Sequence, residues 1–108
     1  MKIEEVRANI VLDSRGEETI EVIVNGCRTS SPSGKSKGKY ETPSYYNSIH
    51  WNIHFLNNFT TKININKFDD LRKLELEIKK KARLKNVQEF GANALFAFES
   101  AVLKALAA

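Results

Sequence analysis

The sequence has one cysteine, two prolines and no long apolar run. A single cysteine cannot form an intrachain disulfide, which is typical of proteins in a reducing compartment. The longest apolar run, ALFAF at 94–98, is far too short to cross a bilayer, and no signal-peptide pattern follows Met1. We therefore expect a cytoplasmic protein without membrane contact.

The sequence also lacks a strong excess of charge of one sign. Its 17 basic and 13 acidic residues give a net charge of +4, which tolerates anionic partners but indicates no specific site. The basic cluster at 79–85 lies where a helix is expected to end, and lysines are favourable there because they oppose the helix dipole. We expect a solvent-exposed helix end and consider nucleic-acid binding unlikely.

The composition is that of a folded globular protein. Of the 108 residues, 42% are apolar and 28% are charged. These proportions argue against disorder, and a chain of this length fits one domain. We expect a single domain over residues 1–108.

The first third of the chain predicts three antiparallel strands joined as a meander. Ile20, Val22 and Val24 alternate with other residues in TIEVIVNG, and a β-rich segment precedes the polar break DSRG at 13–16. The dipeptide Asn25-Gly26 favours a tight turn, and residues 27–30 are expected to form the third strand.

The remaining chain has helical periodicity in three segments. SIHWNIHFLNNF predicts a helix capped by Ser48 or an earlier residue, and ANALFAFESAVLKALAA is the most apolar segment of the chain. In NKFDDLRKLELEIKKKA one apolar face is expected from Phe68, Leu71, Leu74, Ile78 and Ala82. The pattern predicts an α+β fold, in which three strands are followed by three or four helices on one face of the sheet.

Between these parts lies the polar loop PSGKSKGKYE at 32–41. Together with VLDSRG at 11–16 and GANALF at 91–96, it resembles, in this order, motifs of the amino-terminal domain of enolase, the phosphopyruvate hydratase of glycolysis. The resemblance covers nearly the whole chain and is thinnest between residues 44 and 67.

The resemblance implies specific roles for the loop. In enolases this loop is mobile, closes over the substrate, and supplies a serine ligand to the second magnesium ion. The position of that ligand corresponds to Ser36, and Arg15 corresponds to a residue near the active-site mouth. The loop residues implied are Ser33, Gly34, Lys35, Ser36, Lys37, Gly38 and Glu41.

Two lysines depart from the family pattern. Lys35 and Lys37 stand where enolases carry small or uncharged residues, and two positive charges beside Ser36 would oppose cation binding by repulsion. Glycine-flanked lysines could instead hold a phosphate, or they could belong to an ordinary solvated loop. His50 and His54 have a spacing that suits metal binding, but no third ligand accompanies them, so exposed or stacked imidazoles are expected.

The family's acid, base and other magnesium ligands lie in a carboxy-terminal barrel, which needs about 250 residues. We therefore expect no catalytic residue in this chain, no activity of the chain alone, and magnesium binding only with a barrel. One reading is a capping domain, either a fragment or a separately encoded half, for interconversion of 2-phosphoglycerate and phosphoenolpyruvate by a lyase. The alternative is a stand-alone, non-catalytic binding or interaction protein with the same fold.

The last helix suggests a partner surface. It carries more apolar side chains than one small core needs, and an exposed apolar patch usually marks an interface. The residues concerned are Leu95, Phe96, Phe98, Val102, Leu103 and Leu106. We expect either a barrel or a second copy of the chain to bind there, with a dimer as the simplest closed assembly.

Overall fold

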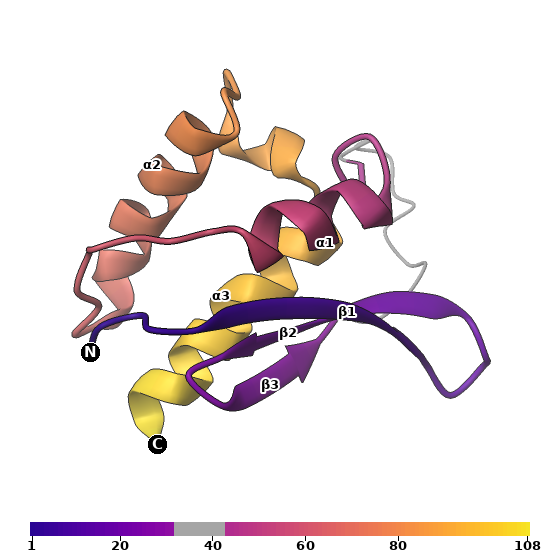
Figure 1. The fold of residues 1–108 in the computed structure, drawn as a ribbon, viewed down its shortest axis with the longest axis horizontal. Helices are drawn as coiled ribbons and strands as arrows, with labels where there is room; N and C mark the ends of the chain where they lie inside the picture. The colour runs from indigo at the N-terminus through magenta and orange to yellow at the C-terminus, as the bar shows by residue number, and fades with distance from the viewer. Residues whose placement is uncertain (32–42) are drawn as a thin grey trace.

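The computed structural model describes residues 1–31 and 43–108 (Figure 1). Its strands are β1 (Val6–Leu12), β2 (Glu18–Val24) and β3 (Cys27–Ser30), and its α-helices are α1 (Ile49–Asn57), α2 (Leu71–Lys81) and α3 (Ala92–Ala107). Two short 3₁₀ helices, η1 (Phe68–Asp70) and η2 (Val87–Phe90), precede α2 and α3. The predicted α+β order of three strands followed by helices is confirmed.

The sheet is an antiparallel meander in the order β1-β2-β3. Val6 pairs with Val24 and Ala8 pairs with Val22, so the alternating apolar residues of both strands share one face. The turn between β2 and β3 is made by Asn25 and Gly26, which have φ angles of 49° and 86°. These angles explain the Asn-Gly dipeptide, because few other residues tolerate both.

The helices cover only the apolar face of the sheet (Figure 1). Helix α3 packs on β2 and β3, and α1 packs on β1. The side chain of Asn57 fixes α1 to the edge of the sheet, since its Oδ1 accepts from the Ala8 amide at 2.8 Å and its Nδ2 donates to the Ala8 carbonyl at 3.1 Å. The opposite face of the sheet is largely polar and carries exposed Arg7, Asn9 and Arg28.

The predicted first helix is confirmed, including its start. The Ser48 side chain accepts a hydrogen bond from the Trp51 amide at 3.1 Å and so caps α1. His50 and His54 are exposed on this helix, as expected.

One residue of the predicted apolar face of α2 was placed wrongly. Leu71, Leu74 and Ile78 are buried as predicted, but Phe68 is 67% exposed. Phe68 lies in η1, and a 3₁₀ helix turns more tightly than an α-helix, so the α-helical spacing does not extend back to it.

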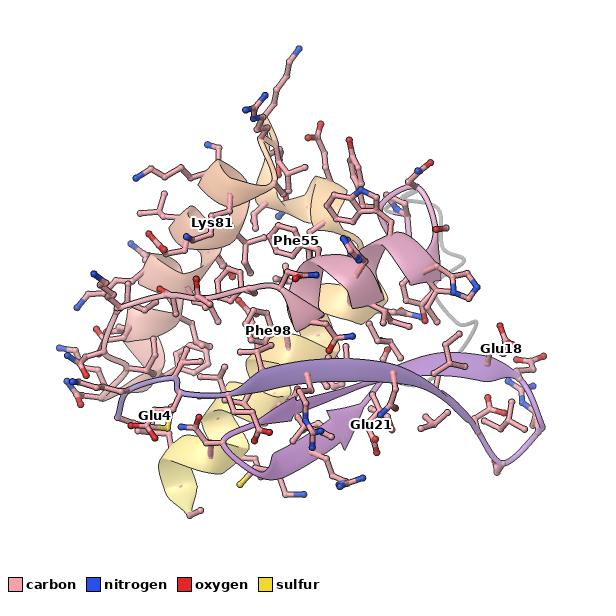
Figure 2. The ribbon with its side chains drawn as sticks, viewed as in Figure 1. Glu4, Glu18, Glu21, Phe55, Lys81 and Phe98 are labelled. Atoms are coloured by element: carbon pink, nitrogen blue, oxygen red, sulfur yellow. The ribbon has the colours of Figure 1, made fainter. Side chains whose placement is uncertain are left out.

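Helix α3 runs beneath the other helices, and its inner face forms much of the core. Phe98 and Val102 are fully buried, and Phe98 lies in the interior (Figure 2). Of the apolar side chains of this helix that were expected at a partner surface, only Phe96 is largely exposed, at 51%, whereas Leu95, Leu103 and Leu106 are partly buried against the core. Within the described residues, no helix has the length and apolar character needed to span a membrane.

Candidate functional site

The predicted substrate loop and its proposed magnesium ligand Ser36 lie outside the described residues. The same holds for Ser33, Gly34, Lys35, Lys37, Gly38 and Glu41. The structure describes the chain on both sides of this segment and the turn that carries Arg15. The candidate site is therefore built from these flanking residues.

The chain before residue 32 is fixed to the start of β2. Ser31 is buried, its amide donates to the Ile20 carbonyl at 3.2 Å, and its carbonyl accepts from Thr19 Oγ1 at 2.7 Å. Thr19 is itself buried, so both bonds are shielded from water. The chain is therefore fixed to the sheet directly before residue 32, and we call this attachment the Ser31 anchor.

The turn between β1 and β2 is organised by Asp13. Its Oδ1 accepts hydrogen bonds from the amides of Arg15 and Glu17, both at 2.8 Å. Its carbonyl accepts from the Gly16 amide at 2.9 Å. An aspartate that binds the amides two and four residues later closes a compact turn, which explains the DSRG sequence physically.

Arg15 is exposed on this turn. Because β3 runs antiparallel to β2, Ser30 pairs with Glu21, and Ser31 bonds to Ile20 and Thr19, nearer the end of β2 that follows the turn. Arg15 and the Ser31 anchor therefore lie at the same end of the sheet. The turn that carries Arg15 therefore leads into the strand to which Ser31 is bonded.

The chain after residue 42 is fixed to the start of α3. The Ala92 amide donates to the Pro43 carbonyl at 2.7 Å, and the Asn93 amide donates to the Ser44 carbonyl at 3.0 Å. The first amides of a helix have no partner within the helix, so they are available to hold another segment. Here they hold the segment that leaves the predicted loop.

Gly91 makes this contact possible. Its φ angle is 111°, and a β carbon at this position would lie 2.5 Å from both the Ser44 carbonyl oxygen and the Tyr45 Cα. Only glycine leaves room for the crossing backbone. The GAN sequence at 91–93 thus combines one residue without a side chain and two amide donors. We call this attachment of Pro43 and Ser44 the second anchor.

A buried amide, which the sequence did not reveal, supports the same region. Asn52 on α1 is fully buried; its Oδ1 accepts from the Tyr46 amide at 2.8 Å and its Nδ2 donates to the Phe90 carbonyl at 2.9 Å. It links α1, the segment after the loop and η2. The sequence shows only that Asn52 is a polar residue among aromatic ones. Its backbone partners belong to other segments, so they could not be inferred from this pattern.

Aromatic rings pack beside Asn52. The Trp51 and Phe55 rings are stacked at 5.3 Å, and Phe55 meets Phe90 edge-on at 5.4 Å between ring centroids. These contacts connect α1 to η2 directly before Gly91. Helix α1 and the start of α3 therefore form one packed unit that holds the anchor.

An acidic pair between α2 and α3 was also missed. Burial, together with a hydrogen bond and charge repulsion from Glu75, raises the pKa of Glu99 to about 8. Glu99 Oε2 is buried without a hydrogen-bond partner. The pair comes from two helices 24 residues apart in sequence, so no local pattern indicates it.

The described residues contain no ready cation site. In residues 1–31 and 43–108, no group of three His, Cys, Asp or Glu side chains is placed to hold a metal ion. His50 and His54 therefore have no third ligand of these types within those ranges.

The structure thus bonds Ser31, before the glycine-rich segment, to the strand that follows the DSRG turn, and it bonds Pro43 and Ser44, after that segment, to the GAN motif. A family model described as Enolase, N-terminal domain, matches residues 3–108, which is essentially the whole chain. The chain belongs to the enolase amino-terminal domain family.

Proposed function

We propose that this chain acts as the capping domain of an enolase. It would contribute a mobile loop that closes on the active site during interconversion of 2-phosphoglycerate and phosphoenolpyruvate in glycolysis. The proposal rests mainly on the family match over residues 3–108. It is supported by the two anchors, since a loop can open and close reproducibly only when both of its ends are held.

The domain would supply one magnesium ligand, the hydroxyl of Ser36. A serine oxygen is a hard ligand that suits this ion, but the described residues add no group of three side chains that could complete a site. The remaining ligands, the acid and the base would come from a barrel. Magnesium bound there would stabilise negative charge on the enolate.

The role in the cell follows from the same proposal. Residues 1–108 would act as one domain in the cytoplasm, where glycolysis takes place, and would bind a barrel or a second copy through α3. Arg15 would lie at the mouth of the active site; in support, it is exposed on the turn that leads into β2, the strand to which Ser31 is bonded.

A stand-alone binding protein is the second candidate. Lys35 and Lys37 favour it, because their charges oppose magnesium binding at Ser36. In that case the fold would be retained without a part in catalysis.

The two functions can be separated by assaying hydration of phosphoenolpyruvate with magnesium. The isolated chain should be inactive, and activity should appear when the chain is joined to the barrel of an enolase. Ser36→Ala should then lower kcat by about tenfold or more, as the loss of a metal-binding group does. Ser30→Ala, an exposed serine on β3, is the matched control and should leave kcat unchanged.

A fusion that folds but has no activity, or whose activity is indifferent to Ser36→Ala, would count against the capping role. Turnover by the pure isolated chain that disappears with Ser36→Ala would contradict the view that the catalytic groups lie elsewhere.

A further inference from the structure

The positive charge of the chain is concentrated in one segment. Residues 62–85 contain nine basic and four acidic side chains, a net charge of +5, whereas the chain as a whole carries +4. The rest of the sequence is therefore slightly acidic. This segment contains α2, and Figure 2 shows many nitrogen-tipped side chains projecting from the outer side of that helix.

An apolar side chain lies at the centre of this charge. Leu76 is 64% exposed and points away from the buried face formed by Leu71, Leu74 and Ile78. On a helix surface, the neighbours of a residue are those three and four positions away. All four such neighbours of Leu76 are basic, namely Arg72, Lys73, Lys79 and Lys80.

Most of these charges are not used within the fold. Two of the lysines form ion pairs: Lys73 Nζ lies 3.5 Å from Asp70 Oδ1, and Lys81 Nζ lies 3.9 Å from Glu77 Oε1. Within the described part of the chain, Arg72, Lys79, Lys80 and Arg83 form no ion pair. Folding therefore does not explain why an exposed leucine is ringed by cations.

A groove adjoins Leu76. It has a volume of about 840 Å³; its apolar lining comes mainly from exposed Leu76, with partly buried Ile63 and largely buried Leu84, and Lys73, Lys80 and Arg83 are among its basic residues. Glu77 also lines the groove, but its Oε1 already accepts from Thr61 Oγ1 at 3.2 Å and faces Lys81. The groove thus combines apolar walls with a rim of excess positive charge.

We propose that this surface, formed by Ile63, Leu76, Leu84 and the surrounding basic side chains, binds an acidic segment of a partner protein that inserts aliphatic side chains into the groove. Charge complementarity selects the partner: carboxylates would meet the cations, and leucine-like side chains would cover Leu76. The surface lies on α2, away from the DSRG turn and the loop anchors, so this binding does not depend on the proposed capping role.

Other anionic partners fit the groove less well. Single-stranded nucleic acids are held by aromatic rings that stack on the bases, and none of the described residues that line this groove is aromatic. An anionic membrane would favour a broad apolar face beside the cations. Here the apolar surface is a single exposed leucine and two residues at the groove.

The test measures fluorescence anisotropy of a short labelled helical peptide made of alternating pairs of glutamate and leucine. We expect saturable binding that weakens as salt is added. A peptide with serine in place of leucine, at equal charge, should bind at least about tenfold more weakly. A peptide with lysine in place of glutamate should not bind.

Variants of the protein locate the site. Leu76→Ser should weaken binding by about tenfold, because it removes the apolar contact that a buried leucine would make. The matched control is Leu12→Ser, whose leucine is 66% exposed on β1 and far from α2 in sequence. Both leucines are exposed, so neither change should unfold the chain.

Charge removal is tested in the same way. Lys73→Gln combined with Lys80→Gln should weaken binding of the glutamate and leucine peptide. Arg7→Gln combined with Arg28→Gln removes the same charge from the outer face of the sheet and should have little effect, since these side chains are 63% and 61% exposed there.

Several outcomes would overturn the proposal. If the serine peptide bound as tightly as the leucine peptide, the surface would attract acidic peptides only through nonspecific electrostatics. Tighter binding of oligo-dT, or of vesicles of phosphatidylserine and phosphatidylcholine, through Lys73 and Lys80 would assign it to nucleic acid or membrane. Concentration-dependent self-association that Leu76→Ser abolishes would assign it to a second copy of the chain.

Discussion

Gly91 and Ser44 approach so closely that a β carbon on residue 91 would lie 2.5 Å from the Ser44 carbonyl oxygen. The nearest atoms belong to the backbone, so no side chain can rotate away to make room. The contact places the segment after residue 42 directly over the first turn of α3.

Gly91→Ala should therefore lower the free energy of unfolding by about 3 kcal/mol, through the clash and the positive φ angle together. Denaturation by urea, followed by circular dichroism, measures the change. Gly26→Ala is the matched control, because Gly26 also has a positive φ angle but a β carbon there would meet nothing within 4 Å. It should cost about 1 kcal/mol. Equal costs at the two positions would show that the Ser44 contact is unimportant.

Asn52→Ala should be strongly destabilising although it removes only a small amide. The change leaves the Tyr46 amide and the buried Phe90 carbonyl without this partner. Unsatisfied groups of this kind cost about 1–3 kcal/mol each, so we expect a loss of about 3 kcal/mol in the free energy of unfolding. Asn58→Ala, which removes an exposed bond to the His54 carbonyl, should cost about 0.5 kcal/mol. A small effect at Asn52 would mean that water replaces both bonds.

The raised pKa of Glu99 should make the free energy of unfolding fall as the pH rises. Its pKa is raised from 4.5 to about 8 in the folded chain, so between these values the folded state holds a proton that the unfolded state has lost. The free energy of unfolding therefore decreases from about pH 4.5 to about pH 8 and then levels off.

Glu99→Gln keeps the neutral side chain and removes this dependence. At pH 8 the variant avoids the partly buried negative charge that Glu99 acquires in the parent, so we expect it to be the more stable of the two. The difference should be only about 1 kcal/mol, because Glu99 is partly exposed and solvent screens its charge. The two should have similar stability at pH 4.5. Thermal unfolding across this range tests the difference, and parallel pH profiles for parent and variant would contradict it.

Phe96→Lys should prevent self-association if α3 forms the interface. Phe96 is 51% exposed, and its helix also carries partly buried Leu103 and Leu106. We expect the parent to form a dimer and the variant to be a folded monomer in sedimentation velocity. Phe68→Lys, at a residue that is 67% exposed outside α3, should leave the dimer intact. A parent chain that stays monomeric at high concentration would exclude this interface.

Local patterns were sufficient to predict most of the fold. The alternation in TIEVIVNG, the Asn25-Gly26 turn and the Ser48 cap depend on residues close in sequence, and each is present in the structure. The three motifs that resemble enolase also led to the correct family. These features can be read from single segments because their physical causes are local.

Two of the three features that were missed depend on contacts between distant segments. Asn52 bonds to a carbonyl 38 residues away, and the pKa of Glu99 is raised by burial between two helices together with Glu75 on the other helix. Phe68 was assigned to the apolar face because the sequence does not mark where η1 ends and α2 begins. Tertiary contacts decide the first two features, and the local change from a 3₁₀ helix to an α-helix decides the third.

The two anchors have a consequence for how this domain can change in evolution. On one side, Ser31 is tied to Thr19 and Ile20; on the other, Pro43 and Ser44 are tied to the first amides of α3. These bonds use the main chain of the anchored segments and include no residue between 32 and 42. Changes of side chain in that interval therefore leave these particular bonds in place, so the attachments at the two ends can persist while the chemistry between them diverges.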